Sequence, residues 1–305
     1  MNIKVKIITA LVGVFFSNSI FGQDISTLIY NAKYKNDSWS QNKLGVAYEN
    51  GDGVQKNLKT AFSWYKKAAN NGDSYGCYNL GRYYENGISV SVDKAKAFHW
   101  YEKAAAAHHA AACCKMGDYY FDGDIVTKDY AKAANYFKDA AWGGFAYGKY
   151  SLGYCYAYGL GVKQDSIRAL IWINRAIEDN YYYADYLLGN MYKSGRGVNE
   201  NINKAVGYYI LGNAHDVPGC MNMLAYCYAK GEGVSVDFQK ALSTIERAIL
   251  LYPDDPNLYD SKGEILWMKG SKEEAREMWD KVNSIDAQFY KENDTELNKY
   301  ILGEK

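Results

Sequence analysis

Proline, net charge and long apolar runs are scarce in this 305-residue chain. Only three prolines occur, which suits an all-helical protein because proline interrupts helices. Thirty-five basic residues balance 35 acidic ones, and the sequence shows no basic stripe of the kind that attracts nucleic acid or an anionic membrane surface. No linker or low-complexity segment divides the chain. We therefore expect no nucleic-acid partner and no second, separately folded domain.

Glycine, in contrast, recurs at a fixed interval of 36 residues, each time three residues before a valine. Tyrosine, alanine and Asn or Asp positions keep the same period. A fixed period of this length is typical of a solenoid of stacked repeats, so we expect one elongated array. The glycines of the series are Gly51, Gly87, Gly123, Gly159, Gly195 and Gly231.

One repeat, residues 38–73, predicts a pair of helices. Gly51 is expected to end the first helix in the left-handed conformation, for which glycine has no steric penalty. Asn57 is expected to cap the second helix. The fold class predicted is all-α, a right-handed α/α superhelical solenoid of helix-turn-helix repeats. The apolar stripes that support the two helices are Leu44, Gly45 and Tyr48, and then Ala61, Trp64, Tyr65 and Ala68.

The motif Leu-Gly-x-x-Tyr-x-x-Gly-x-Gly-Val is complete at 152–162 and 188–198, and an Arg-Ala or Lys-Ala pair follows at 168–169 and 204–205. These residues resemble the Sel-like repeat (SLR) family, which is related to the tetratricopeptide repeats. The resemblance covers about residues 24–286 and implies a scaffold for protein–protein interaction. Ser89 and Ile125 replace the second turn glycine, and Met116 and Ala225 disturb the Leu-Gly pair.

The domain organisation that we predict has five parts. Residues 1–22 form a signal peptide, 23–37 a half-repeat cap, 38–255 six 36-residue repeats, 256–286 a tetratricopeptide-like repeat, and 287–305 a polar capping helix. In the signal peptide, Lys4 and Lys6 precede an apolar run that is too short to span a bilayer, and cleavage is expected after Gly22. An uncleaved anchor is the alternative. We expect a periplasmic or extracellular protein that is not inserted in the membrane after cleavage.

The six cysteines are expected to be buried free thiols. Cys77 and Cys113 are equivalent positions one repeat apart, so their helices should lie roughly 8–10 Å apart, beyond the Cα separation of about 7 Å that a disulfide tolerates. Some relatives within the family carry a disulfide in each repeat, but the required spacing is absent here. His108 and His109 lie near Cys113 and Cys114 in the sequence, yet they fall at a junction between repeats, and we expect neither a metal site nor a cofactor.

Two Ser-x-x-Lys tetrads, at 63–66 and 91–94, and Lys193-Ser194-Gly195 match elements of penicillin-recognising enzymes. The repeat pattern already explains each of them, so we expect no enzyme. Some proteins similar to the family have been described as weak penicillin binders or β-lactamases. A weak penicillin-binding or β-lactamase-like hydrolase of the cell envelope is therefore the alternative function.

The predicted binding surface follows from the tetratricopeptide-like register, in which the first helix of each pair lines the concave side. Our hypothesis is an exported adaptor whose tyrosine-rich groove holds an extended peptide or a partner helix, because tyrosine is favoured at interfaces. The alternative is that these tyrosines only pack between neighbouring first helices, although we expect Tyr48 and its equivalents to occupy that buried position. The predicted partner-binding residues are Tyr75, Tyr78, Arg82, Tyr147, Tyr150, Tyr154, Tyr158, Tyr183, Tyr186, Asn190 and Tyr226.

Overall fold

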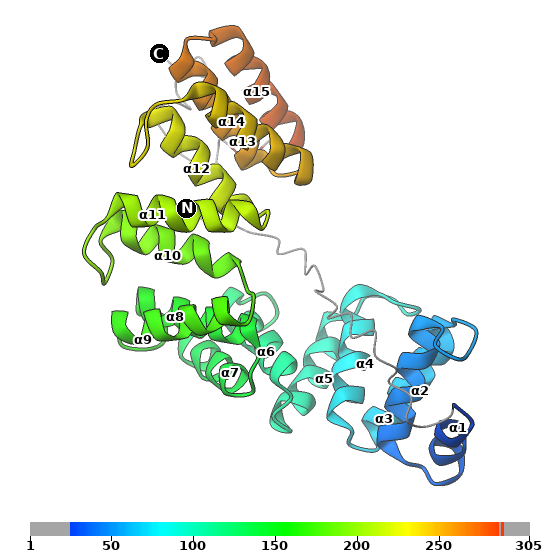
Figure 1. Cartoon of the computed structure of the whole chain (residues 1–305). Coiled ribbons are helices and arrows are strands. Elements are labelled where there is room, and N and C mark those ends of the chain that lie inside the picture. The colour runs from blue at the N-terminus through cyan, green and yellow to red at the C-terminus, as the bar shows by residue number, and fades with distance from the viewer. Residues whose placement is uncertain (1–24, 287, 290–305) are drawn as a thin grey trace. The chain divides into compact units, whose positions relative to one another are not determined.

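The computed structural model describes residues 25–286, 288 and 289 (Figure 1). Within these residues the chain forms 15 α-helices and no strands, as the fold class predicted. They fall into two compact units that divide between Asp179 and Asn180. The first unit contains α1 (Ile25–Tyr34), α2 (Ser38–Asn50), α3 (Leu58–Asn70), α4 (Ser74–Asn86), α5 (Lys94–Ala106), α6 (Ala110–Asp122), α7 (Tyr130–Trp142), α8 (Ala146–Tyr158) and α9 (Ser166–Glu178).

The second unit continues the alternation of first and second helices. It contains α10 (Tyr183–Ser194), α11 (Ile202–Ala214), α12 (Pro218–Lys230), α13 (Phe238–Leu251), α14 (Pro256–Lys269) and α15 (Lys272–Ile285). In each unit every first helix packs against its own second helix, and each second helix packs against the first helix of the next pair where one follows. This is how a repeat buries apolar stripes that it could not bury alone.

The helix ends follow the sequence prediction. Gly51 takes φ of 90° and its N–H bonds to the carbonyl of Ala47, and the other five glycines of the series end their helices in the same way. Asn57 accepts a hydrogen bond from the N–H of Thr60 at 3.0 Å. The equivalent Asn or Asp caps every second helix from α5 to α13, and each such cap contributes about 1 kcal/mol.

Two positions in the turns adopt a left-handed backbone in most repeats. The second turn glycine, as at Gly53, is left-handed, and Ser89 keeps that conformation with φ of 60°, whereas Ile125 does not, as expected of a β-branched residue. The loop before each first helix contains another such position, which we did not predict. Its occupants, 36 residues apart, are Asn36, Gly72, His108, Gly144, Asn180 and Asp216.

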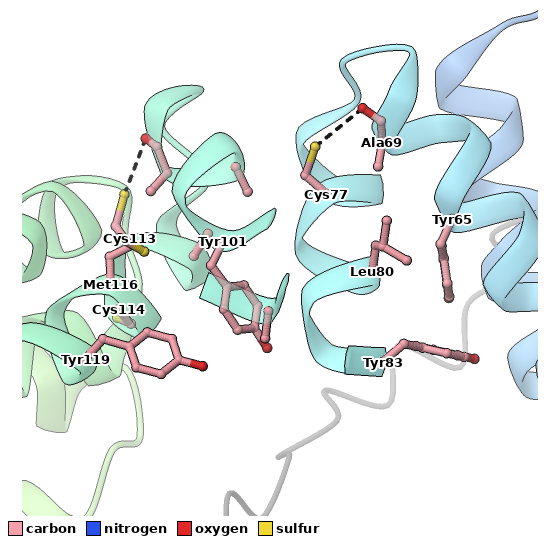
Figure 2. Packing of buried hydrophobic residues seen from close by; sticks show 14 of the residues in the cluster. Tyr65, Ala69, Cys77, Leu80, Tyr83, Tyr101, Cys113, Cys114, Met116 and Tyr119 are labelled. Atoms are coloured by element: carbon pink, nitrogen blue, oxygen red, sulfur yellow. Dashed lines mark hydrogen bonds between the residues drawn. The ribbon is translucent and has the colours of Figure 1, made fainter. Parts of the chain in front are cut away.

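The core explains the glycine of the Leu-Gly pair. A Cβ added to Gly45 would lie 2.6 Å from the ring of Tyr65, and one added to Gly81 would lie 2.7 Å from the ring of Tyr101. Each glycine therefore lets a large side chain of the second helix lie flat on the backbone of the first. The fully buried tyrosines include Tyr65, Tyr83, Tyr101 and Tyr209, and Figure 2 shows the cluster around the first three.

One expectation about the core was wrong. Tyr48 and its equivalents every 36 residues are half-buried rather than buried. From Tyr84 onward a cation lies above the ring: Lys96 Nζ lies 5.4 Å from the ring centre of Tyr84, and the same arrangement recurs one repeat on with Lys132 and Tyr120 at 5.0 Å. The basic residue of the Lys-Ala or Arg-Ala pair thus covers the outer face of this tyrosine, an arrangement worth about 0.5–1 kcal/mol at exposed sites.

The ends of the array are only partly described. Helix α1 lies within the predicted half-repeat cap and packs against α2, and α14 and α15 form the last pair around the left-handed Gly270. The predicted signal peptide, 1–22, lies outside the described residues, as does all of the predicted capping helix except residues 288 and 289. Among the described helices, none combines the length and apolarity needed to cross a bilayer.

Candidate functional site: the first-helix face

The predicted partner-binding residues lie on the first helices of both units. We call the side chains at these positions, together with those on the corresponding side of the other first helices, the first-helix face. It is formed by α2, α4, α6 and α8 in the first unit and by α10, α12 and α14 in the second. Almost all of these side chains are half-buried, and Tyr75, with 60% of its surface exposed, is the most open tyrosine among them.

Four tyrosines form a row along one side of α8. Their spacing of three or four residues places them on the same side of the helix. The ring centres of Tyr147 and Tyr150 lie 6.3 Å apart, those of Tyr150 and Tyr154 6.4 Å, and those of Tyr154 and Tyr158 4.4 Å. The phenyl ring of Phe121, on α6, meets Tyr154 edge-on at 6.1 Å. The sequence thus predicted a cluster that the structure does assemble within one unit.

A buried carboxylate fixes the first ring of this row. The hydroxyl of Tyr147 donates to Asp118 Oδ1 at 2.7 Å. Burial raises the pKa of Asp118 to about 7, although this hydrogen bond and the nearby Lys115 act in the opposite direction. Burial also raises the pKa of Asp122, one helical turn further along α6. Asp118 therefore borders the tyrosine row in a desolvated setting, whereas Asp122 is exposed at the end of α6.

Ion pairs join the first helices that precede α6. Arg82 on α4 binds Glu49 on α2 at 3.0 Å, and Lys115 on α6 binds Glu85 on α4 at 3.0 Å. In both repeats the tyrosine hydroxyl of the second helix also donates to the glutamate, from Tyr65 at 2.5 Å in the first case. Arg82, which the register predicts as a partner-binding residue, is thus held by a carboxylate of its own chain.

A histidine joins the two tyrosines of α4. The ring of His109 stacks on Tyr78 at 4.7 Å between centres and meets the edge of Tyr75 at 4.6 Å. Its Nδ1 accepts from the N–H of Ala112 at the start of α6. Burial lowers the pKa of His109 to about 4. The imidazole is therefore neutral near pH 7 and acts as a helix cap and a packing surface.

The second unit places its predicted residues among partners of their own chain. Asn190 accepts from the hydroxyl of the buried Tyr209 at 2.8 Å, and Tyr226 donates to Glu264 on α14 at 2.7 Å. The ring of Tyr186 lies against the backbone of Gly219, where a Cβ would be 2.8 Å away. Tyr183 lies 5.6 Å from Tyr181 between ring centres. These contacts fix the orientation of the side chains.

Sequence reasoning missed the groups that hold this face in place. Lys115, His109 and Glu264 were not among the predicted binding residues. One signal was available: Glu49 and Glu85 each stand 16 residues before a second-helix tyrosine, Tyr65 and Tyr101, and the spacing repeats with the period of the array. The partners across neighbouring repeats carry no such signal, because the pairing residue changes from arginine to lysine and moves along the helix.

Several residues of the enzyme alternative make contacts within their own repeats or with the neighbouring turn. Ser63 Oγ donates to the carbonyl of Lys59 on its own helix at 3.0 Å. Lys94, of the second tetrad, forms an ion pair with Asp124, and Asp93 caps α5 as expected. Ser194 Oγ donates to the carbonyl of Asn190 at 2.8 Å. Ser63 and Ser194 are thus each hydrogen-bonded to their own helix.

The cysteines are free and buried in the structure, in agreement with the sequence interpretation. The thiols of Cys77 and Cys113 point at the carbonyl oxygens of Ala69 and Ala105, with sulfur–oxygen distances of 3.7 and 3.8 Å (Figure 2). Burial raises the pKa of both thiols to about 11. Across the described residues, no group of three or more His, Cys, Asp or Glu side chains is arranged to hold a metal ion.

Comparison with known proteins supports the repeat assignment along most of the array. A family model described as the Sel1 repeat matches residues 40–73, 74–109, 110–142, 146–181, 183–214 and 218–243. A search of curated proteins finds no match.

Solved structures give the same picture. A Sel1 repeat protein from Oxalobacter formigenes is 33% identical, with a TM-score of 0.62, over 72% of this chain and 91% of that one. The Escherichia coli protein c5321, described as a protective antigen of uropathogenic strains with an SLR fold, is 28% identical, with a TM-score of 0.68, over 86% of this chain. The chain spans 56% of the length of c5321. Yeast Tom70, at 12% identity and a TM-score of 0.51, shares the fold alone.

Proposed function

Because the chain belongs to the Sel1 repeat family, we propose that it is an exported scaffold that binds a partner protein along its first-helix face. Sel1 repeat solenoids are commonly scaffolds for protein–protein interaction. The observation that carries the proposal is the tyrosine row of α8, Tyr147 to Tyr158. Together with Phe121, which contacts Tyr154, it forms a half-buried aromatic strip.

Such a strip has the properties of a recognition surface. Tyrosine offers a large, rigid area with a polar tip, and few rotamers are lost when it is covered. Contacts such as the Tyr147–Asp118 hydrogen bond hold the rings in one orientation before any partner arrives. A surface that is already ordered loses less entropy on binding. An extended peptide or a helix with apolar side chains is the kind of ligand that such a face accommodates.

The experiment that tests the proposal replaces Tyr150, Tyr154 and Tyr186 by alanine. Partner capture from the native cell envelope should be abolished, because the aromatic contact area is removed, while the helical circular dichroism is retained. The matched control replaces three exposed isoleucines of second helices, Ile167, Ile171 and Ile210, and should leave capture intact. Undiminished capture by the tyrosine variant would refute the role of the face.

Packing within the chain makes a second readout necessary. If the triple variant melts earlier than the parent, the single variants Tyr150→Ala and Tyr186→Ala, measured below their melting temperatures, should each show a partial loss of capture. Equal losses from the isoleucine control would mean that general destabilisation, and not the loss of the rings, explains the result.

Export is the other part of the proposal, and it is supported by the basic and apolar pattern of residues 4–22. Expression of the full chain in a bacterial host, followed by N-terminal sequencing of the protein from the envelope fraction, tests it directly. The expected N-terminus is Gln23. An intact Met1 in the cytosolic fraction would contradict export.

A further inference from the structure

Ion pairs join neighbouring first helices from α2 to α6. Among the described residues, no ion pair continues this series from α6 to α8. Glu49 is bound by Arg82, and Glu85 is bound by Lys115. The residue two repeats after Arg82 is Tyr154. On α8 an aromatic ring therefore occupies the position that a guanidinium occupies on α4.

Two carboxylates of α6, those of Asp118 and Asp122, lie on the helix that precedes α8 in this series. Among the described residues, Asp118 binds a tyrosine hydroxyl in place of a cation, and Asp122 takes part in no ion pair. They stand four residues apart on one side of α6, where like charges repel. Lys115 lies near Asp118, but its ammonium is bound to Glu85. Lys128 lowers the pKa of Asp122 in part, but neither carboxylate forms an ion pair with a cation of the described residues.

Aromatic residues lie next to these carboxylates, beginning with Tyr147 at Asp118. Phe121 lies between them in the sequence and contacts Tyr154, which in turn lies next to Tyr150. The face of an aromatic ring attracts a cation within about 6 Å of its centre, more strongly when the site is desolvated than when it is exposed. The chain already uses this chemistry elsewhere, as in the lysine placed above Tyr84.

We infer that the surface formed by Asp118, Phe121, Asp122, Tyr150 and Tyr154 binds an arginine or lysine side chain of the partner. We call it the cation subsite. It rests on the proposed function, because it assigns a chemistry to a partner that the first-helix face holds. The partner's cation supplies the positive charge that no ion pair of the described residues provides between α6 and α8. The aromatic rings cover the planar guanidinium of an arginine or the methylene groups of a lysine.

Arginine suits the subsite better than lysine. The guanidinium is planar, stacks on aromatic rings, and presents several N–H groups that two carboxylates can share. A lysine ammonium would satisfy the charge but would stack less well. An acidic or purely apolar peptide segment would cover both carboxylates without compensating their charge, which is costly. The expected order of preference is arginine, then lysine, then neutral residues.

The test begins with a random peptide library displayed on phage and panned on the full mature protein. Peptides enriched by the parent protein should carry at least one arginine or lysine. The double variant Asp118→Asn, Asp122→Asn should enrich peptides without this preference, because asparagine keeps the shape and still accepts from Tyr147 but carries no charge. The matched control Asp139→Asn, on the exposed side of α7, should keep the preference.

Affinities then measure the contribution of the charge. An enriched peptide and its Arg→Gln version, labelled with fluorescein, are titrated against both proteins by fluorescence anisotropy. The neutral peptide should bind the parent about tenfold or more weakly, and the two peptides should bind the double variant equally well. Binding of the basic peptide should strengthen from about pH 6 to pH 8 as Asp118 loses its proton, since only the carboxylate attracts a cation.

Two failures are distinguishable. If peptides are enriched on the parent without any basic residue, or if the neutral peptide binds equally well, the cation subsite is refuted and the proposed function stands. If no peptide is enriched, or if the variant lacking Tyr150, Tyr154 and Tyr186 enriches the same peptides, the proposed function fails and the subsite fails with it.

Discussion

Asp185 on α10 is a buried carboxylate whose Oδ1 has no hydrogen-bond partner among the described residues. Burial raises its pKa to about 6, and the nearby His215 lowers it only in part. Equivalent positions in other repeats hold Cys77 and Cys113, whose thiols point at backbone carbonyls. The charge at Asp185 is therefore a local source of instability.

Asp185→Asn should stabilise the protein near pH 7 and change little near pH 4. The folded-state pKa lies above the unfolded one, so the native state binds the proton more tightly, and stability is lost as the pH rises from about 4 to about 6. The gain above pH 6 should be at most about 3 kcal/mol, the free energy of a shift of two pKa units. Urea unfolding at both pH values measures it.

The control for this prediction is Asp254→Asn, a change at an exposed aspartate of the same unit. It should leave the free energy of unfolding nearly unchanged at either pH. A gain that is equal at the two pH values for Asp185→Asn would contradict the assignment of its effect to a buried charge.

Ser89→Gly tests the second turn position. Ser89 holds φ of 60°, a conformation that costs an L-residue roughly 1–2 kcal/mol and costs glycine nothing sterically. After allowance for the greater freedom of glycine in the unfolded chain, the variant should gain about 0.5–1 kcal/mol, measured as a rise in melting temperature. Ser243→Gly, on an exposed position inside α13, should do the opposite.

What could be predicted at this scale depended on whether a residue type repeats. The left-handed glycines and the Asn or Asp caps repeat with the period and were found. The left-handed position at Asn36, His108 and Asp216 was missed, because several side chains tolerate that backbone and their identity varies from repeat to repeat. The raised pKa of Asp185 depends on burial, which the sequence around it does not show.

At the scale of the helix pair, the close approach of first and second helices depends on the Leu-Gly glycine. Gly81→Ala would place a methyl group 2.7 Å from the ring of Tyr101, so one of the two helices must shift. The expected loss of stability is about 1–3 kcal/mol, as for other overpacked cores, and thermal unfolding followed by circular dichroism measures it.

Gly207→Ala is the matched control, because this glycine lies on an exposed side of α11 and a Cβ there meets nothing within 4 Å. It should stabilise the helix by up to about 1 kcal/mol, since alanine has the higher helix propensity. If Gly81→Ala were also neutral or stabilising, the tyrosine would not be packed on the glycine as described.

The helix pair also shows why one sequence expectation failed. The regular tyrosine at Tyr84 and its equivalents was expected to be buried because it repeats. Regularity identifies a conserved geometry within the array but does not distinguish a core contact from a stack between a ring and Lys96 at the surface. The signal for that stack was the common period of the tyrosine on the first helix and the basic residue on the second helix, as in Tyr84 and Lys96.

At the scale of the whole molecule, the array protects its cysteines. All six are free and buried, and burial raises the pKa of Cys155 to about 12. Since the thiolate is the reactive form, native protein should react with less than about one equivalent of a thiol reagent such as Ellman's reagent at mildly alkaline pH. Denatured protein should reveal all six thiols.

Two outcomes of that labelling would contradict the account. Rapid labelling of several thiols in the native state would mean that the repeats open easily. Fewer than six thiols in denatured, unreduced protein would mean that disulfides form after export, against the free thiols described here.

The repeat period made the repeat architecture predictable, whereas the contacts of the first-helix face were predictable only in part. The register placed Tyr147, Tyr150, Tyr154 and Tyr158 on one helix side, and the structure shows their rings in contact. The same register placed Arg82 among the binding residues, but its charge is held by Glu49. Contacts between repeats depend on the length and conformation of the side chains. The repeat register gives only the position of each residue along the helix.

The most direct measurement of the central claim is site-specific photo-crosslinking in the native cell envelope. Benzoylphenylalanine is placed at Tyr150, on the first-helix face, or at Ile171, an exposed residue of the second helix α9. The account predicts a discrete crosslinked product from position 150 and none from position 171. A product from position 171 alone would contradict it.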